Sequence, residues 1–219
     1  MDNRFWLDRW RQNQIGFHQP DINPYLERYW PETGLSPDES VFVPLCGKSR
    51  DMHWLADRGH PVLGVEVSQV AVDAFYEEQH ITPIVIRKGH FNDYRSDQVQ
   101  ILCGDYFDLA AEDLIKVRGV YDRASLIAFP EALRREYVQH LRTILKPGTP
   151  ILLITLEYPP EEMVGPPFSV DGVEIHALFE PLYSVECLHR ESILDENPHF
   201  RKRGLSRLIE SAYRLSYRA

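Results

Sequence analysis

The sequence predicts an α/β protein in which helices cover both faces of a mostly parallel β-sheet. Short apolar runs at residues 41–44, 62–67 and 151–156 have the length and composition of buried strands. Helical patterns separate these runs, and such alternation is typical of parallel strands joined by crossover helices. A chain of 219 residues and 25.6 kDa suits one domain with a full core, so we expect a single domain over residues 1–219.

The composition disfavours several classes of partner. A formal net charge of −9 and a sequence pI near 5.5 argue against binding to nucleic acid, which is itself a polyanion. The three cysteines, Cys46, Cys103 and Cys187, are odd in number and far apart, as expected for reduced thiols. The sequence shows neither an apolar leader nor a run that could span a bilayer. We therefore expect a cytoplasmic, monomeric protein that acts on a small molecule, with no membrane partner.

Residues 1–40 predict a helical cover that precedes the sheet. Residues 3–12 place Trp6 and Trp10 on one face and charged side chains on most of the remainder, a pattern typical of an amphipathic helix. A second short helix is expected at residues 23–29. Because the first helix precedes the first strand, we expect it either to pack on the outside or to fold over the binding edge.

Residues 41–68 predict a strand, a tight loop at 45–49, a helix at about 50–58 and a second strand. This is a βαβ unit, and ligands of open parallel sheets bind beyond the carboxyl ends of the strands. Glu66 lies near the end of the second strand, where a carboxylate can accept hydrogen bonds from both hydroxyls of a ribose. An ordinary crossover without a ligand is the alternative, because a fold alone implies no activity.

The loop at 45–49 does not match the motifs that cradle phosphates. Gly47 is its only glycine, whereas dinucleotide-binding turns need three. Gly47, Lys48 and Ser49 imitate the end of a P-loop, but the first glycine of that motif would fall at Phe42. A cofactor with a ribose and no phosphate remains, and S-adenosylmethionine is the commonest candidate.

The remaining chain supplies the other elements of the fold. Ser68 is expected to cap the next helix, which would turn Val70, Ala71, Ala74 and Phe75 towards the sheet. The further expected elements are, in order, that helix to about residue 79, an insertion with a hairpin near 82–98, strands at 99–102 and 119–122, a helix at 130–146, a strand at 151–156, a proline-rich loop at 157–168, a short helix within 170–179, and two antiparallel tail strands at 183–189 and 205–215.

Residues 43–68, VPLCGKSRDMHWLADRGHPVLGVEVS, resemble the thiopurine S-methyltransferase family, and the resemblance extends from about Arg4 to the C-terminus. It implies a Rossmann-like class I methyltransferase fold with a mostly parallel seven-stranded sheet, a core over residues 41–219, and S-adenosylmethionine as cofactor. It also implies methylation of aromatic and heterocyclic thiols. Bacterial members have been linked to selenium and tellurium compounds, so such acceptors, or other small acceptors, are the alternative.

Six residues are assigned to the cofactor. The resemblance places a tryptophan against the cofactor at Trp10, and an aromatic face attracts a sulfonium cation by roughly 0.5 to 2 kcal/mol. Asp105 follows the third strand, where it would accept from the adenine amino group while Tyr106 covers the base; capping a turn is the alternative for Asp105. Arg123, carried over from the family, would clamp the carboxylate of the cofactor or the substrate sulfur. We expect four side chains to converge at one rim: Leu45, Glu66, Asp105 and Arg123.

For the substrate pocket, the resemblance assigns Phe17 as a stacking platform, and Arg123 serves as the anion clamp. The alternative for that pair is that Asp122 and Arg123 neutralise each other or a helix end. His18 is interpreted as a surface or hydrogen-bonding residue in preference to a proton acceptor. The resemblance also implies a basic residue in the region 199–203, where the sequence does not decide among His199, Arg201 and Arg203.

The expected reaction is direct in-line transfer of a methyl group, without a catalytic nucleophile or a metal. Neither Ser/His/Asp nor Cys/His spacing is evident, and Cys46, His53 and His60 lack the paired spacing of zinc ligands. Heteroaromatic thiols ionise more readily than the cysteine reference of about 8.5, so a strong base need not be present near neutral pH. The rival class is a nicotinamide-dependent oxidoreductase, which the missing glycine-rich turn disfavours.

Overall fold

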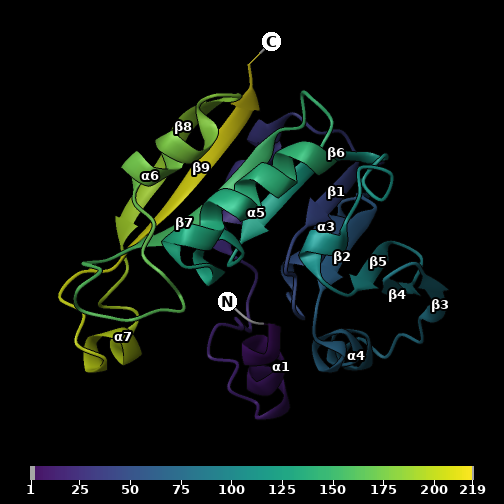
Figure 1. Cartoon of the computed structure of the whole chain (residues 1–219), viewed down its shortest axis with the longest axis horizontal. Helices are drawn as coiled ribbons and strands as arrows, with labels where there is room; N and C mark the ends of the chain where they lie inside the picture. The colour runs from purple at the N-terminus through teal and green to yellow at the C-terminus, as the bar shows by residue number, and fades with distance from the viewer. Residues whose placement is uncertain (1–2, 219) are drawn as a thin grey trace.

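The computed structural model describes residues 3–218, and within them it contains one nine-stranded sheet. The strand order is β3-β4-β5-β2-β1-β6-β7-β9-β8 (Figure 1). The strands are β1 (Ser40–Val43), β2 (Val62–Glu66), β3 (Ile84–Lys88), β4 (Phe91–Arg95), β5 (Val99–Cys103), β6 (Val117–Arg123), β7 (Ile151–Glu157), β8 (Tyr183–Ser192) and β9 (Ile209–Tyr217). The five central strands, from β5 to β7, pair in parallel, whereas the pairings at both ends of the sheet are antiparallel.

The expected number of seven strands is wrong, because the predicted insertion at residues 82–98 adds two strands to the sheet. These are β3 and β4, and β4 pairs antiparallel with β5. Phe91 and Tyr94 of β4 are buried, whereas β3 is exposed along its whole length, with Ile84 at 70%. The hairpin thus extends the sheet at one edge instead of standing outside it, and the resulting sheet is mixed.

Helices cover both faces of the sheet, as predicted. Side chains from α5 and α6 join the core on one face, and side chains from α2, α3 and α4 join the core on the other. The helices are α1 (Asn3–Arg11), α2 (Pro24–Tyr29), α3 (Asp51–Asp57), α4 (Gln69–Glu78), α5 (Glu131–Ile144), α6 (Gly172–Phe179) and α7 (Pro198–Lys202), with short 3₁₀ segments at Trp30–Thr33, Tyr106–Asp108 and Leu126–Ala128. None of the helices in the described part of the chain combines the length and apolar composition needed to cross a bilayer.

Helix α4 begins where the sequence predicts but turns a slightly different face to the sheet. Oγ of Ser68 accepts a hydrogen bond from the backbone N–H of Ala71 at 3.4 Å, which confirms the predicted cap. Val70 was expected to face the sheet, but it is 47% exposed, and Val72 is buried in its place. The buried stripe runs from Ala71 and Val72 to Phe75 one turn later, which follows the helical period.

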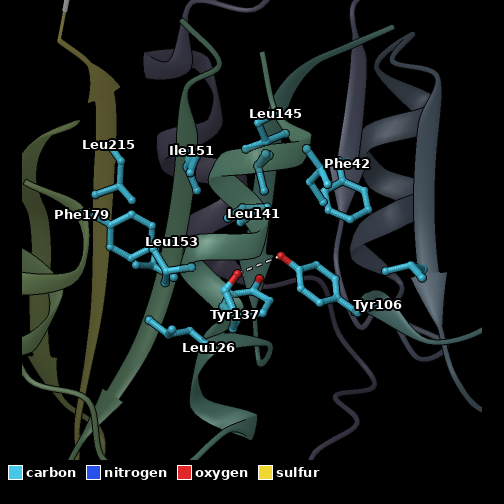
Figure 2. Close-up of a cluster of buried hydrophobic side chains, with 14 of the residues drawn as sticks. Phe42, Tyr106, Leu126, Tyr137, Leu141, Leu145, Ile151, Leu153, Phe179 and Leu215 are labelled. Atoms are coloured by element: carbon cyan, nitrogen blue, oxygen red, sulfur yellow. Dashed lines mark hydrogen bonds between the residues drawn. The ribbon is translucent and has the colours of Figure 1, made fainter. Parts of the chain in front are cut away.

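The core beneath α5 positions the segment that follows β5. Phe42 of β1 packs in this core with Leu141 of α5 (Figure 2). The hydroxyl of Tyr106 donates to the backbone carbonyl oxygen of Tyr137 at 3.1 Å, the contact drawn as a dashed line in Figure 2. Since Tyr106 directly follows Asp105, this contact fixes the turn that carries the Asp105 carboxylate.

Helix α1 lies below the sheet in Figure 1, with α7 at the same end of the molecule and the C-terminus at the opposite end. Nδ2 of Asn3 donates to Oδ2 of Asp105 at 2.6 Å, which joins α1 to the turn after β5. Of the two placements considered for the N-terminal helix, the structure therefore shows the second, over the carboxyl edge of the parallel strands.

Candidate functional site

A cavity of about 410 Å³ opens at the carboxyl edge of the parallel strands. Its walls come from the ends of these strands, from β9, from α1 and α7, and from the loop between α1 and α2. All seven residues assigned to cofactor or substrate line it: Trp10, Phe17, Leu45, Glu66, Asp105, Tyr106 and Arg123. The expected convergence is present in the structure, whereas the contacts of these residues with a ligand stay predictions.

Glu66 ends β2 and is only 6% exposed. Its Oε2 accepts a hydrogen bond from the backbone N–H of Gly47 at 2.9 Å, and its Oε1 accepts one from the N–H of Ser68 at 2.8 Å. Burial raises the pKa of the Glu66 carboxyl to about 7, against the lowering effect of these N–H groups. Because each carboxylate oxygen can accept a second hydrogen bond, the two hydroxyls of a ribose fit this group.

The loop after β1 passes directly beneath the indole of Trp10. Leu45 and Gly47 have φ angles of 44° and 52°, in the left-handed region. A Cβ added to Gly47 would lie 3.1 Å from Cζ2 of Trp10. Glycine therefore suits this position both because of its positive φ angle and because of the close approach of Trp10. The N–H of Gly47 already donates to Glu66. The loop therefore differs from diphosphate-binding loops, in which a row of unpaired backbone N–H groups contacts the phosphates.

Arg123 ends β6 and is held by a buried carboxylate. Its Nε donates to Oδ2 of Asp51 at 2.7 Å, and its NH2 donates to Oγ of Ser49 at 3.3 Å. Asp122 accepts instead from the hydroxyl of Tyr137 at 2.6 Å, in the core on the other face of the sheet. The two side chains therefore do not neutralise each other, but Oδ1 of Asp122 accepts from the backbone N–H of Leu126 at 3.3 Å, at the start of the 3₁₀ segment Leu126–Ala128, so the helix-end form of the alternative holds for Asp122. A guanidinium carries five N–H donors, so Arg123 keeps donors for an anion in the cavity.

The Asp105 carboxylate is bonded on both oxygens. Oδ1 accepts from the backbone N–H of Phe107 at 2.9 Å, which is the cap considered as the alternative, and Oδ2 accepts from Asn3. Tyr106 lines the cavity, but its ring is mostly in the core and only 4% exposed. Phe107 also lines the cavity and is 39% exposed, so it is the more accessible of the two rings. The sequence analysis missed Phe107, although it directly follows the predicted pair.

Aromatic side chains of the N-terminal segment contact one another at the cavity wall. The ring of Phe17 lies 5.5 Å from that of Trp6 and 5.5 Å from that of Trp10, in edge-to-face contacts that restrict its orientation. His18, interpreted as a surface or hydrogen-bonding residue, is partly buried in the same wall. Burial, followed by the nearby charge of Lys48, lowers its pKa from the ordinary histidine value.

The C-terminal part of the chain contributes cavity residues that the sequence did not single out. Glu210 of β9 is partly buried there, and burial raises the pKa of its carboxyl to about 7. In the region left undecided, His199 and Arg203 line the cavity, whereas Arg201 is absent from its lining and pairs with Asp195.

The strand order, the carboxylate at the end of β2 that suits a ribose and the loop that lacks a diphosphate cradle fit a class I methyltransferase that uses S-adenosylmethionine. The chain belongs to the thiopurine S-methyltransferase family, whose model matches residues 1–218, and the resemblance seen in the sequence is thereby confirmed. The predicted methyltransferase activity and cofactor are confirmed with it, and the family match gives no support to the oxidoreductase alternative.

Several bacterial relatives carry the name thiopurine S-methyltransferase. One from Nitrosospira multiformis is 50% identical over 218 residues, which cover 100% of this chain and 99% of the relative. One from Pseudomonas fluorescens is 47% identical over 218 residues, which cover 100% of this chain and 100% of the relative. Both alignments span the cavity residues as well as the sheet.

Solved methyltransferases share the fold at low sequence identity. An S-adenosylmethionine-dependent methyltransferase from Anabaena variabilis matches with a TM-score of 0.64 and 15% identity, covering 97% of this chain and 93% of the other. A Burkholderia thailandensis 1,6-didemethyltoxoflavin-N1-methyltransferase, solved with bound 1,6-didemethyltoxoflavin and S-adenosylhomocysteine, matches with a TM-score of 0.63 and 13% identity, covering 97% of this chain and 86% of the other. These likenesses support the α/β methyltransferase fold.

Proposed function

We propose that this chain transfers the methyl group of S-adenosylmethionine directly to the sulfur of aromatic or heterocyclic thiols. The observation that carries the proposal is the division of the cavity into two unlike parts. The part at β5 and β2 has the carboxylates of Asp105 and Glu66. The part at β6 and β7 has Arg123 together with apolar side chains in or after these strands, namely Ile127, Phe129, Leu156, Pro166 and Pro167, and Phe17 lines the same cavity from the loop between α1 and α2.

The carboxylate part suits the adenosyl group. Glu66 would accept from the ribose hydroxyls, and Asp105 from the adenine amino group if Asn3 shares that oxygen. Trp10 stands above the loop that carries Leu45, where an aromatic face would attract a cation. When bound, S-adenosylmethionine supplies a methyl group on a sulfonium centre. Arg123, oriented by Asp51, would bind its carboxylate or the acceptor sulfur.

The aromatic part suits a planar acceptor. The edge-to-face contacts of Phe17 with two tryptophans hold its ring in one orientation, as a stacking platform requires. Reaction of an anionic sulfur with a cationic sulfonium removes charge, so a cavity that excludes water favours the transition state. Alignment of the two reactants supplies most of the remaining acceleration, with effective molarities on the order of 10⁵ M or more.

Relatives at 46 to 50% identity named thiopurine S-methyltransferase support a sulfur acceptor. The test is a comparison of isosteric acceptors with labelled S-adenosylmethionine: thiophenol and a thiopurine against phenol, aniline and the corresponding oxopurine. We expect label in the two sulfur compounds and none in the oxygen and nitrogen compounds.

Equal labelling of phenol or aniline would remove the preference for sulfur. Selenite belongs in the same panel, because its methylation in the absence of thiol methylation would favour the selenium alternative. A mass spectrum of each product establishes which atom carries the methyl group.

A further inference from the structure

Glu210 is the one acidic side chain of β9 that lines the cavity within the described chain. It is partly buried, and its carboxylate has neither a hydrogen bond nor an ion pair with any residue between 3 and 218. Other acids at the cavity are engaged, since Glu66 and Asp105 each accept hydrogen bonds on both oxygens. The Glu210 carboxylate is therefore available to a molecule in the cavity.

The strand pairing places Glu210 on the acceptor side. Arg123 is aligned with Ile154 of β7, and Leu156, two residues further along, is aligned with Glu210 of β9. Residues two apart share a face of a strand, so Arg123 and Glu210 project from the same face of the sheet. Strands lie ~4.8 Å apart, which puts β9 roughly 10 Å from β6 and roughly 24 Å from β5. Glu210 is thus remote from the adenosyl end and adjacent to the aromatic part of the cavity.

The chemistry of a thiol acceptor creates a need for a base at this side. A neutral acceptor carries a proton on sulfur or, in the thione form, on a ring nitrogen. When the S–CH₃ bond forms, the methyl–sulfonium bond breaks and its electron pair goes to the cofactor sulfur. The acceptor must then lose its proton to become a neutral thioether, and the proton needs a destination in the cavity.

We propose that the Glu210 carboxylate takes this proton from the ring nitrogen or sulfur of the acceptor. The inference rests on the proposed function, because it concerns the acceptor of that reaction. The N–H or S–H bond breaks, an O–H bond forms on Glu210, and the proton later leaves to water through the mouth of the cavity. Atoms and charge balance without any further reactant.

The electrostatic surroundings of Glu210 favour this role. Burial raises the pKa of its carboxyl to about 7, and the charges of Asp51 on α3, Glu191 on β8 and Glu196 raise it further, while Arg123 on β6 lowers it. A carboxyl with a pKa near 7 can both gain and release a proton at neutral pH, which suits a general base.

His18 is the competing base, and its neighbours disfavour it. Burial lowers the pKa of its imidazole, and the charges of Lys48, Arg123 and Arg50 lower it further, so protonated His18 would stand among like charges. Glu78 acts in the other direction but does not reverse the shift. The acidic groups near Glu210, by contrast, make proton uptake there easier.

The test uses Glu210→Gln, which keeps the size of the side chain and removes the base. Two acceptors are compared with the full chain: benzimidazole-2-thione, which is neutral with its proton on ring nitrogen, and 4-nitrothiophenol, which is already ionised at neutral pH. We expect kcat/KM for the thione to fall about 100-fold and kcat/KM for the ionised thiol to change by less than about threefold. Glu186→Gln, an exposed position on β8 outside the cavity where Glu186 pairs with Arg214, is the control for the loss of a carboxylate elsewhere and should leave the ratio of the two values unchanged.

The ratio between acceptors is the readout, so a loss of folded enzyme cancels from it. An equal fall of kcat/KM for both acceptors would assign Glu210 to binding or structure and overturn the proposal, and so would unchanged kcat/KM values for both. A changed ratio in His18→Asn with none in Glu210→Gln would transfer the role to His18. If the unsubstituted chain methylates neither sulfur compound, the proposed function itself fails, which is a separate result.

Discussion

Glu66→Gln tests the central contact of the cofactor site. The carboxylate accepts from two backbone N–H groups, those of Gly47 and Ser68, and offers its remaining lone pairs to a ribose. Glutamine has one accepting oxygen and an NH₂ group, so one of the two N–H groups would face a donor. The substitution therefore removes an acceptor from the ligand and leaves a buried donor unpaired in the protein.

The magnitude follows from these contacts. A hydrogen bond to a charged group contributes roughly 1.5 to 3 kcal/mol, and loss of about 3 kcal/mol across the ribose diol raises Kd about 100-fold. The unpaired N–H costs roughly 1 to 3 kcal/mol of stability, but the substitution also removes the cost of about 3 kcal/mol that ionising the buried carboxyl carries above pH 7, so the free energy of unfolding should change little at pH 8. Isothermal titration of S-adenosylhomocysteine measures the loss of affinity, and urea unfolding measures the change in stability.

The pH dependence of binding adds an independent measurement. With its pKa at about 7, Glu66 is roughly nine-tenths protonated at pH 6 and roughly one-tenth protonated at pH 8. Ribose hydroxyls stabilise the ionised form, so binding should release a proton at pH 6. The affinity should then be about tenfold lower at pH 6 than at pH 8, and Glu66→Gln should lose this dependence.

The proposed contact of Glu66 with the ribose is refuted if the Kd of Glu66→Gln for S-adenosylhomocysteine at pH 8 lies within about threefold of the Kd of the unsubstituted chain. Such a ratio corresponds to a difference in binding free energy of under about 1 kcal/mol. Glu136→Gln, an exposed position on α5, is the matched control for the loss of one negative charge. Proton release that persists in Glu66→Gln would assign the pH dependence to another group.

Three further predictions concern stability. Arg123→Ala should lower the free energy of unfolding, measured in urea, by about 3 kcal/mol, because it leaves the Asp51 carboxylate buried without its cation. The double variant Arg123→Ala with Asp51→Asn should recover part of this loss. A double variant whose loss equals the sum of the two single losses would contradict this prediction. Gly104→Ala would place a Cβ 2.5 Å from Cδ1 of Phe91, so the free energy of unfolding should fall by about 1 to 3 kcal/mol. Calorimetry should show a Tm lower by about 4 °C, and an unchanged Tm would mean that the β3–β4 hairpin moves to accommodate the methyl group. Burial raises the pKa of Glu66 from its ordinary 4.5 to about 7, so between these two pH values the folded protein binds a proton that the unfolded chain has lost. The free energy of unfolding should therefore fall by about 3 kcal/mol as the pH rises from 4.5 to 7, as far as Glu66 contributes. A rise over the same range would count against this prediction.

Four of the predicted site residues lie at or just after the carboxyl ends of parallel strands. Leu45 follows β1 closely, Glu66 ends β2, Asp105 follows β5 and Arg123 ends β6. The carboxyl ends of parallel strands meet at one edge whatever the details of packing, so recognising the strands was sufficient to place these side chains together. The strand patterns themselves are strong, because both faces of these strands are buried.

Sequence reasoning failed where position depends on pairing at the sides of the sheet. The segment at residues 82–98 has an exposed apolar strand and a polar turn, and nothing in its letters says that β4 pairs with β5. Glu210 reaches the cavity only because β9 runs antiparallel beside β7, which turns the start of β9 towards the carboxyl edge. An acid at the beginning of a tail strand otherwise resembles any solvated surface group.

The partner of Arg123 could not be found from the sequence either, and it links the N-terminal cover to the chemistry. Asp51 is fully buried and lies 72 positions before Arg123. Its Oδ1 accepts from the backbone N–H of Asn23 at 2.9 Å, and its Oδ2 accepts from the hydroxyl of Tyr121 at 3.0 Å as well as from Arg123. The start of α2, the strand β6 and the guanidinium in the cavity therefore share one carboxylate.

This shared carboxylate makes the N-terminal segment part of the site and not merely a lid over it. A shift of α2 would move the N–H of Asn23, unbalance the buried Asp51 and release the guanidinium of Arg123 from its orientation. Asn3 ties α1 to Asp105 at the adenosyl end in the same way. The two ends of the cavity thus each depend on a hydrogen bond from the first 23 residues, so substitutions in that segment should alter cofactor affinity even where they touch no ligand.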